Sequence, residues 1–439
     1  MSTDVSLERG LESPKPPRPR MVRTAVVVGT ALEHYDFFLY GTAAALVFNT
    51  QYFASENPLV ASLAAFATFA VGFAARPIGA VLFGQLGDTL GRRKTLILTL
   101  VLIGISTGLI GVLPNYAAIG VWAPIALVLL RLLQGISFGG EWAGAVTLAA
   151  EHAPKGEEGH YGSLPQLGSP IGNLVGSTAF LALGFLPTEI FDSWGWRIPF
   201  LAAFPLLLIA LWMRVIVEES PEFEKTSERG ETFRAPVIEV VKREPGGLFA
   251  SAALAFVSIG GFFLVTTFAI SYGTGTIGLD RNVMLTATLL ASALQICTVI
   301  ITGRIADRVP PIKLAFIGLW TTVILAVPSI LMLSSGSPVL AILAVVMIVQ
   351  PIAMAYAVTG VILPELFSTS LRYSGVAIGY NIAGFVGGFM PMLATSLLLA
   401  FDSQAWPIAS LLMVIAVISL LGGYAARTRM ARLKKASQS

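Results

Sequence analysis

Long apolar runs dominate the chain and alternate with short polar segments. A bilayer-spanning helix needs roughly 20 predominantly apolar residues, and twelve such runs are present. They fall at residues 24–48, 61–84, 95–113, 119–150, 161–186, 197–217, 247–272, 283–304, 313–334, 338–363, 374–400 and 405–426. Each run is continuous, which excludes the alternating strands of about ten residues that build a membrane β-barrel. In a soluble protein nothing would cover so many helices that are apolar on every side.

Composition supports an all-α membrane protein. The 439 residues are 55% hydrophobic and 12% charged, with a mean hydropathy of +0.79, whereas soluble domains carry about 25% charged residues. No soluble domain is expected. The single cysteine, Cys297, falls inside the eighth run, where we expect a small core residue.

The distribution of basic residues predicts the orientation. With the N-terminus in the cytoplasm, Arg197 and Arg281 lie in outer loops and Arg76 and Arg131 lie within spans, while all other lysines and arginines of the 28 face the cytoplasm. This asymmetry follows the positive-inside rule. We therefore expect a multi-pass membrane protein with both termini in the cytoplasm. The net charge of +3 is interpreted as a topology signal and not as a nucleic-acid surface.

A charged linker divides the chain near its midpoint. The predicted organisation is a disordered N-terminal tail at 1–21, a six-helix half at 22–217, a cytoplasmic linker at 218–246, a second six-helix half at 247–426 and a basic tail at 427–439.

The two halves share landmarks at nearly constant spacing. Gly84-Gln-Leu-Gly-Asp88 between spans two and three corresponds to Gly303-Arg-Ile-Ala-Asp307 between spans eight and nine. Glu151 and Glu365 end spans four and ten in the same way. Repeats of this kind build alternating-access transporters, with a substrate site near the membrane midplane. The sequence therefore predicts two pseudo-symmetric halves.

The segment 84–94, Gly-Gln-Leu-Gly-Asp-Thr-Leu-Gly-Arg-Arg-Lys, resembles the signature of the major facilitator superfamily between its second and third helices. The resemblance implies a twelve-helix major facilitator fold and a cytoplasmic charge network that latches the inner gate. The second copy is degraded, because Pro310 and Pro311 replace its glycine and basic run. The expected gating residues are Gly84, Asp88, Gly91, Arg92, Arg93, Glu151, Asp307, Glu365 and Arg372.

A closer resemblance is to the metabolite:proton symporter family, which includes transporters of shikimate, α-ketoglutarate, citrate, and proline or betaine. It is carried by the segments 29–38, Arg76-Pro77, 139–142 and 218–221, and it is nearest to the shikimate-transporter branch. The resemblance implies proton-coupled import of a small polar metabolite, either an organic carboxylate or a zwitterion such as betaine or proline. One departure is His34, where the family usually has tryptophan.

Five charged residues fall deep within predicted spans of the first half: Glu33, Asp36, Arg76, Arg131 and Glu141. Each costs roughly 2.5–3.5 kcal/mol on insertion scales, so such residues are functional by default. Desolvation and pairing with arginine shift a carboxyl pKa in opposite directions, so a carboxylate that exchanges its arginine partner can load and release a proton. Our hypothesis is that Asp36 or Glu33 carries the proton, with Glu141 as the alternate. Arg131 or Arg76 would then pair with a substrate carboxylate. The alternative is a static ion-pair network that only holds helices together.

Polar residues elsewhere in the spans complete the expected pocket, although such residues also serve as helix–helix contacts. The expected substrate-binding residues are Tyr35, Arg76, Arg131, Gln134, Gln166, Tyr272, Tyr380 and Asn381.

Other functions compete with symport. A proton-coupled drug or metabolite exporter would carry a glycine-proline motif in span five, which Gly168-Ser-Pro-Ile-Gly172 only approximates. A uniporter would ignore the proton gradient. The sequence carries no nucleotide loop, metal cluster or nucleophilic constellation, so we expect neither an enzyme nor a cofactor beyond the proton gradient. We expect a monomer that binds its metabolite, protons and lipid.

Overall fold

The computed structural model describes residues 19–53, 55–90, 92–138, 141–151, 153–208, 236–368 and 371–436. Within those ranges the ordered elements are helices, and no strand is present. Seven helical segments are long and apolar enough to cross a membrane, and three shorter apolar helices accompany them. Grouped in chain order, the helices form the twelve spans expected from the sequence, so the prediction of an all-α membrane protein is confirmed.

The first half contains spans one to six. They are α1 (Pro19–Ala43) with η1 (Ala44–Phe48) and α2 (Asn49–Gln51); α3 (Pro58–Leu90); α4 (Arg92–Val112); α6 (Trp122–Ser137) with α7 (Glu141–Glu151); α8 (Glu158–Ser163) with η2 (Leu164–Leu167) and α9 (Gly168–Gly184); and η3 (Gly195–Arg197) with α11 (Ile198–Leu201). Two short helices, α5 (Tyr116–Ile119) and α10 (Thr188–Ser193), lie in connections.

The second half contains spans seven to twelve. They are α15 (Pro245–Phe256) with η4 (Val257–Gly261), η5 (Leu264–Phe268), α16 (Ala269–Ser271) and η6 (Tyr272–Thr276); α17 (Arg281–Ala306); α18 (Pro311–Leu333); α19 (Pro338–Ala357) with α20 (Thr359–Ile362); α21 (Arg372–Gly388) with α22 (Met390–Ala400); and α23 (Trp406–Ala436). The short η7 (Pro364–Leu366) follows span ten.

Helix extends into three segments that the sequence prediction placed outside the two halves. α1 begins at Pro19, within the segment 1–21 expected as a disordered tail. The last part of the expected linker folds as the helix α14 (Pro236–Arg243), while most of the linker lies outside the described residues. The segment expected as a basic tail from residue 427 continues α23 without a break to Ala436. The last two segments can be helical because neither contains a proline after its first turn.

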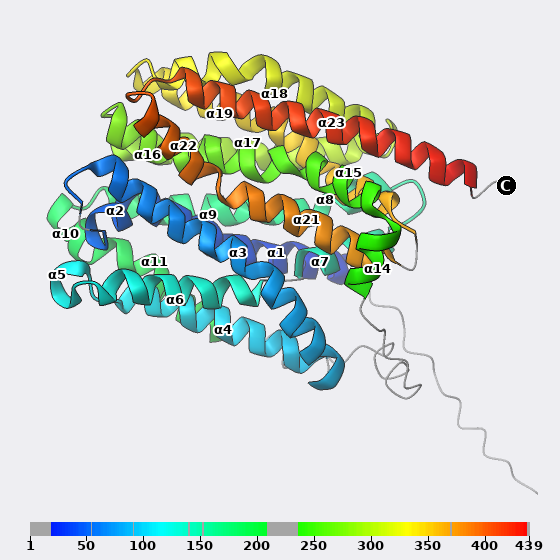
Figure 1. The fold of residues 1–439 in the computed structure, drawn as a ribbon, viewed down its shortest axis with the longest axis horizontal. Coiled ribbons are helices and arrows are strands. Elements are labelled where there is room, and N and C mark those ends of the chain that lie inside the picture. Colours follow the sequence, from blue (N-terminus) through cyan, green and yellow to red (C-terminus); the bar gives the residue numbers. More distant parts are fainter. Residues whose placement is uncertain are drawn as a thin grey trace, which may run out of the picture.

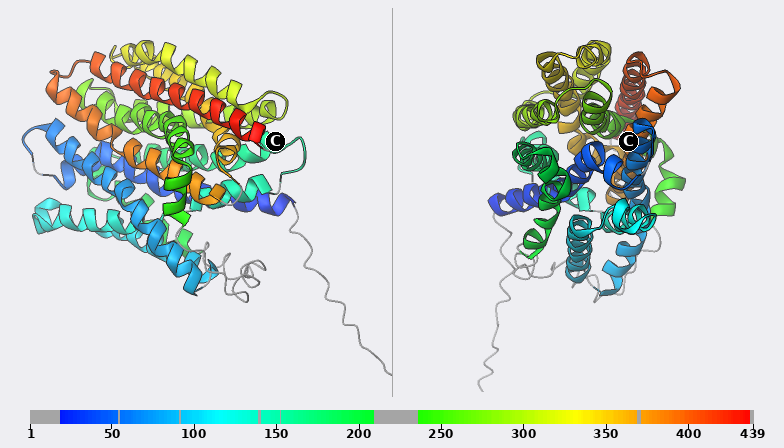
Figure 2. Two further views of the ribbon diagram at one scale, coloured as in Figure 1. Left: turned by 45° about the vertical axis from the view of Figure 1, so that its right-hand side comes forward. Right: turned by 90° about the vertical axis from the view of Figure 1, so that its left-hand side faces the viewer.

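The two halves lie side by side along the bundle. In Figure 1 the first half, blue to green, occupies the lower part and the second half, green to red, the upper part, and Figure 2 shows the same bundle from two further directions. The halves meet mainly where α9 packs on α17 and where α3 packs on α21 and α22. These contacts join spans five and eight, and spans two and eleven.

The surface of the bundle is apolar between two charged ends. Ile324 of α18 is 68% exposed and Val339 of α19 is 65% exposed, as expected for side chains that face lipid. Cys297 is exposed as well, so the expectation of a core cysteine is wrong. The reason is that α17 is apolar on both its buried and its exposed faces, and a lone small residue does not reveal which face it occupies.

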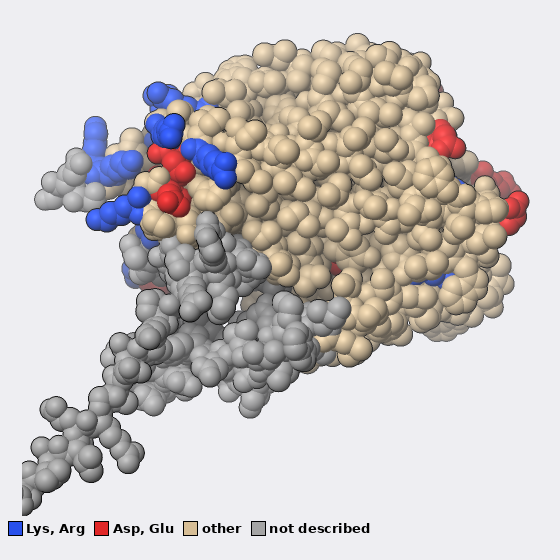
Figure 3. Space-filling model, turned by 180° about the vertical axis from the view of Figure 1, so that it is seen from behind, with Lys and Arg blue, Asp and Glu red and all other residues tan. Residues whose placement is uncertain are grey.

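Basic residues gather at one end of the bundle, which carries α14, the α17–α18 connection and the last turns of α23; we call this the basic end (Figure 3). The opposite end carries the acidic residues of α10 and the N-cap Asp280 of α17. This separation follows the charge asymmetry of the sequence.

Candidate functional site

A buried ion pair joins the first and fourth spans of the first half. Arg131 Nη1 of α6 lies 3.8 Å from Asp36 Oδ2 of α1, and the two side chains are 0% and 3% exposed. Gln134, one turn after Arg131, donates from Nε2 to Asp36 Oδ1 at 2.9 Å and accepts from Arg131 Nη1 at 3.2 Å. Thr107 of α4 also donates to Asp36 Oδ1. The structure thus brings together three residues that the sequence singled out, and adds Thr107.

This pair is close but incompletely hydrogen-bonded. Among the described residues, Asp36 Oδ2 and Arg131 Nε and Nη2 have no hydrogen-bond partner, although all three atoms are buried. Buried polar atoms are normally satisfied, and exceptions call for an explanation. Here the unused hydrogen-bonding capacity lies on two opposite charges that face one another.

Aromatic rings and a glycine make room for the Arg131 guanidinium. Its carbon lies 4.1 Å from the ring centroid of Tyr40 and 5.1 Å from that of Phe37. A Cβ at Gly72 of α3 would lie 2.4 Å from Arg131 Nε. Cation–π contacts of this kind partly replace lost hydration. A side chain at position 72 would displace the guanidinium from Asp36.

Arg76 of α3 lies on the other side of the same aromatic bank. Its guanidinium carbon is 4.2 Å from the centroid of Phe37 and 4.4 Å from that of Phe73. The side chain is 7% exposed. A Cβ at Gly384 of α21 would lie 3.8 Å from Arg76 Nη1, so this arginine reaches the second half. Phe37 therefore separates the two buried arginines, one paired within the first half and one at the interface.

A second group of predicted residues forms a chain across the halves. Gln166 of η2 accepts from Trp142 Nε1 of α7 at 3.3 Å and donates from Nε2 to Thr359 Oγ1 of α20 at 3.3 Å. Trp142 stacks on Tyr380 of α21. Gln166 and Tyr380 were expected from the sequence, whereas Trp142 and Thr359 were not assigned. The chain crosses between the halves twice.

Three other predicted pocket residues each make a hydrogen bond outside these two groups. Tyr35 donates to the carbonyl of Pro199 at 3.0 Å, within the first half. The hydroxyls of Tyr272 and Ser334 lie 2.9 Å apart, at the end of the bundle opposite the basic end. Asn381 donates to Ala377 O of its own helix at 2.9 Å. His34 likewise bonds its own helix, through Nδ1 and the carbonyl of Thr30 at 2.7 Å.

Much of the expected gate lies outside the described side chains. These are the side chains of Asp88, Arg92, Arg93 and Glu151, together with Gly84 and Gly91, and the side chains of the expected proton-coupling residues Glu33 and Glu141 lie outside them as well. No structural statement is made of them, and their roles stay predictions.

In the second half the expected latch of Asp307, Glu365 and Arg372 is not assembled as ion pairs among the described residues. Asp307 Oδ1 instead accepts from the backbone N–H of His160 at 2.9 Å. That bond joins the second half to the start of α8 in the first half. The physical reason is that a backbone N–H at a helix start is as good a partner for a carboxylate as a side chain, and it is nearer here.

A charged clasp that the sequence did not reveal holds the second half at its basic end. Arg429 Nη2 of α23 lies 2.7 Å from Glu244 Oε2, and Arg429 Nε donates to Leu366 O at 2.6 Å. Glu244 Oε1 accepts from both the N–H and the hydroxyl of Ser368. Glu244 sits between α14 and α15, so the clasp ties the end of the linker to spans ten and twelve.

Glu365 lies beside this clasp, outside the membrane spans. Desolvation raises the pKa of its carboxyl above the usual 4.5, and the positive charges of Lys434 and Arg372 partly oppose that rise. The carboxyl of Glu365 is therefore easier to protonate than that of a glutamate in free solution.

A polar seam continues the interface between α9 and α17. Asn173 Nδ2 donates to Ser292 Oγ at 2.8 Å, and the hydroxyls of Ser177 and Thr288 lie 3.3 Å apart. Nearer the opposite end, Arg281 Nη2 donates to Gly184 O at 3.0 Å. Contacts between the halves thus extend along this seam from the chain at Gln166 to the opposite end.

The site offers buried charged and polar side chains for binding a polar ligand. In the region described it shows no arrangement for metal chemistry. No group of three or more histidine, cysteine or acidic side chains is placed to hold a metal there. A buried ion pair inside one six-helix half, beside polar contacts that join it to a second six-helix half, is the arrangement of a multi-pass secondary transporter.

Comparison with known proteins identifies the family. The family model described as Major Facilitator Superfamily matches residues 26–394. The chain belongs to the major facilitator superfamily, as its signature segment predicted, and it is a transporter and not an enzyme.

Among curated relatives, the shikimate transporter of Escherichia coli (strain K12) is 39% identical over 410 residues, covering 92% of this chain and 93% of the relative. The glycine betaine/proline/ectoine/pipecolic acid transporter OusA of Dickeya dadantii (strain 3937) is 34% identical over 422 residues, covering 92% and 83%. The sequence resemblance to metabolite transporters is therefore confirmed.

Solved structures share the fold. The proton:xylose symporter XylE bound to 6-bromo-6-deoxy-D-glucose superposes with a TM-score of 0.71 at 17% identity, covering 92% of this chain and 94% of the other. A partially occluded inward-open form of XylE from E. coli gives 0.70 at 19% identity, covering 92% and 98%. The predicted major facilitator fold is confirmed.

Proposed function

We propose that this protein is a proton-coupled symporter that imports a small polar metabolite bearing a carboxylate, by alternating access. The observation that carries the proposal is the incompletely bonded Asp36–Arg131 pair, buried at 3.8 Å within the first half. Asp36 is the proposed proton site and Arg131 its charge partner. Arg76, which reaches the second half beside Gly384, is the proposed ligand of the substrate carboxylate.

The coupling follows from the way the two charges depend on each other. Ionised Asp36 neutralises Arg131, and Gln134 and Thr107 hold its carboxylate in place. Protonation of Asp36 leaves Arg131 without a counter-charge in a medium where unpaired charge is expensive. A substrate carboxylate bound at Arg76 lies on the other side of the Phe37 ring from Arg131, and its negative charge offsets part of that cost. Proton and substrate therefore favour one another, as symport requires.

The substrate class rests on the chemistry that the relatives' substrates share. Shikimate, glycine betaine, proline, ectoine and pipecolic acid, which name the relatives, all carry a carboxylate. In the proposed orientation the basic end faces the cytoplasm of a bacterium and both termini lie there. The proton gradient supplies the energy, no other cofactor takes part, and the monomer is the transporting unit.

The test compares two kinds of transport in proteoliposomes. Wild-type protein should accumulate labelled shikimate or glycine betaine only when a proton gradient is imposed. Asp36→Asn should abolish this uphill uptake and keep counterflow exchange, which needs no net proton movement. Thr107→Val, which removes one bond to Asp36 but keeps the carboxylate, should retain uphill uptake at a reduced rate. Glu33→Gln and Glu141→Gln test the alternative proton sites.

Each contrary result has a separate meaning. Full uphill uptake by Asp36→Asn would remove Asp36 from the coupling. Wild-type uptake that ignores a protonophore would indicate a uniporter. Proton movement opposite in direction to substrate movement would indicate a proton-coupled exporter.

A further inference from the structure

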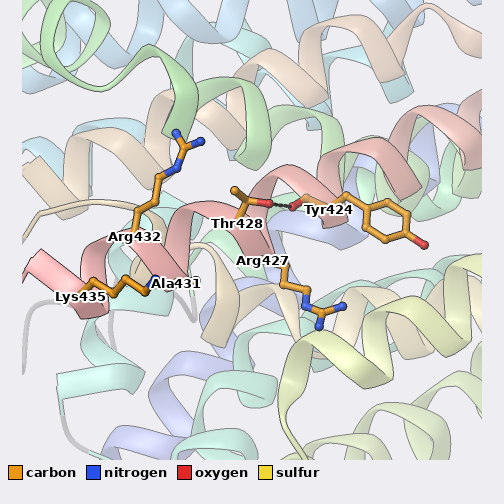
Figure 4. Close-up of a pocket in the computed structure, with 6 residues that line it drawn as sticks. All are labelled: Tyr424, Arg427, Thr428, Ala431, Arg432 and Lys435. Carbon is orange, nitrogen blue, oxygen red and sulfur yellow. Dashed lines mark hydrogen bonds between the residues drawn. The ribbon is translucent and has the colours of Figure 1, made fainter.

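The last turns of α23 form a basic hollow that the transport site does not use. Six residues of this helix line a hollow of about 460 Å³: Tyr424, Arg427, Thr428, Ala431, Arg432 and Lys435. Figure 4 shows Arg427 and Arg432 reaching out on opposite sides of the helix axis, with the short side chains of Thr428 and Ala431 between them. At 100° per residue the six fall within about 140° of one another, so they share one face of the helix. All six are exposed.

The same face of α23 is apolar farther up the helix. Val414, Val417 and Leu421 are 53%, 41% and 57% exposed. At 100° per residue they project in the directions covered by the hollow. Side chains of this type on the outside of a membrane bundle contact lipid chains. The hollow therefore continues a lipid-facing stripe.

Depth along the helix places the near end of the hollow, at Tyr424 and Arg427, in the headgroup layer, and Arg432 and Lys435 lie roughly 8 and 12 Å farther along the helix. At about 1.5 Å per residue, Arg427 lies roughly 9 Å beyond Leu421. Tyr424, 47% exposed, stands between them, where aromatic side chains mark the membrane interface. The headgroup layer of each leaflet is roughly 5–8 Å thick, and long basic side chains reach several ångströms along the helix to meet it.

The basic groups of the hollow differ from Arg429 of the same helix. Arg429 faces inward and is paired with Glu244. Arg427, Arg432 and Lys435 have no ion pair with any described carboxylate. Three uncompensated cations along one face of α23, directly below a lipid-facing stripe, complement a phosphate group. We propose that this hollow binds the headgroup of an anionic phospholipid. This site is independent of the proposed transport function.

Binding is tested on the purified full-length protein with short-chain lipids. The probe is dihexanoyl phosphatidylglycerol, titrated against the protein in a neutral detergent and followed by native mass spectrometry. Dihexanoyl phosphatidylcholine tests the headgroup charge, and inorganic phosphate tests a free anion. Wild-type protein should bind the phosphatidylglycerol and neither of the other two at the same concentration.

A charge-matched pair of variants locates the site. Arg427→Gln/Arg432→Gln/Lys435→Gln should weaken phosphatidylglycerol binding roughly 100-fold, because each basic residue near an anionic headgroup contributes about a fivefold factor. Arg304→Gln/Arg308→Gln/Lys313→Gln removes the same charges from exposed positions of the α17–α18 connection and should bind as wild type does. Arg427→Lys/Arg432→Lys should stay within a few-fold of wild type, because lysine binds phosphate as a point charge.

Three results would overturn the proposal. The first is equal weakening by both triple variants, which would reflect net charge alone. The second is equal binding of phosphatidylcholine, and the third is equal binding of inorganic phosphate, which would indicate a site for a soluble anion. The lysine variant guards against misfolding, since it keeps the charge while changing both arginines.

Discussion

The indole ring of Trp142 lies flat against the phenol ring of Tyr380, with centroids 3.5 Å apart and planes inclined by 11°. Trp142 belongs to the first half and Tyr380 to the second. Trp142 follows Arg131 by eleven residues along span four, about 16 Å nearer the basic end. Alternating access separates the halves at one end at a time. The stack must therefore break whenever the basic end opens.

Trp142→Ala should shift the protein toward the form that is open at the basic end. An aromatic pair contributes about 0.5–1.5 kcal/mol beyond the area it buries, which corresponds to roughly a two- to tenfold change in population. The measurement is maleimide labelling of Ser163→Cys, a position 1% exposed and packed against Gly303, in a Cys297→Ser background. Trp142→Phe keeps a stacking ring and should label close to the parent rate. Equal labelling rates in Trp142→Ala and the parent would show that the stack does not hold the halves.

Gly360→Ala should prevent the basic end from closing. A Cβ at this position would lie 2.0 Å from the carbonyl oxygen of Gly162 in the other half. Overpacking of this kind typically costs 1–3 kcal/mol, and backbone cannot move away as a side chain can. We expect at least a tenfold loss of uphill uptake and faster labelling at position 163.

Gly176→Ala is the matched control for this prediction. It lies on the same first-half span as Gly162, and its Cβ would meet nothing closer than 3.8 Å. Its uptake should remain near that of the wild type. If Gly360→Ala also transports normally, the contact between the halves at Gly162 is not required for closure.

The sequence was sufficient to identify the site residues whose insertion into a membrane costs free energy. Asp36 and Arg131 stood out because a charge in a span is costly, and their pairing in the structure follows the same logic. The twelve spans were readable because lipid demands continuous apolar helices. Asp307 was identified from the repeat. Its partner is the backbone N–H of His160, and a sequence gives no signal for such a partner because every residue except proline has a backbone N–H.

Contacts that depend on helix rotation escaped prediction. Trp142 and Tyr380 are ordinary aromatic residues in apolar spans, and only the packing of the two halves brings them together. Glu244 was one more charge in a charged linker, yet the fold buries it to 7% exposure against Arg429. Thr107 is a single threonine in an apolar span and was not expected in the site, yet its hydroxyl reaches Asp36.

Protonation of Glu365 should stabilise the observed arrangement of the basic end. Because desolvation raises the pKa of this carboxyl in the folded protein, the folded form binds the proton more tightly than the unfolded chain. Its contribution to stability is therefore fully present below the unfolded pKa near 4.5 and is lost as the pH rises through the folded pKa. Glu365→Gln should flatten the fall in Tm over that window, measured by intrinsic fluorescence.

Glu158→Gln provides the control of opposite sign. Backbone N–H groups of Glu158 and Gly156 lower the pKa of the exposed Glu158 carboxyl. Its contribution is lost only as the pH falls, so this variant should leave the slope of Tm above pH 4.5 unchanged. Identical slopes for wild type and Glu365→Gln would show that Glu365 does not titrate in this range.

Asn173 and Ser292 should be energetically coupled across the halves. Their 2.8 Å hydrogen bond joins α9 to α17, and bonds of this type between membrane helices contribute about 0.6 kcal/mol on average. A double-mutant cycle of Asn173→Ala and Ser292→Ala, measured by thermal unfolding, should return a coupling of that order.

The comparison is Thr298 with Gln350, a 2.6 Å pair contained within the second half. A transporter whose halves separate spends part of its time with the first bond broken and all of its time with the second intact. If displacing Arg131 in the Gly72→Ala variant favours the closed seam, the coupling between Asn173 and Ser292 should be larger in that variant than in the wild type. The coupling between Thr298 and Gln350 should be the same in both proteins. If the Asn173–Ser292 coupling is zero while the Thr298–Gln350 coupling is measurable, the hydrogen bond across the seam does not contribute to stability.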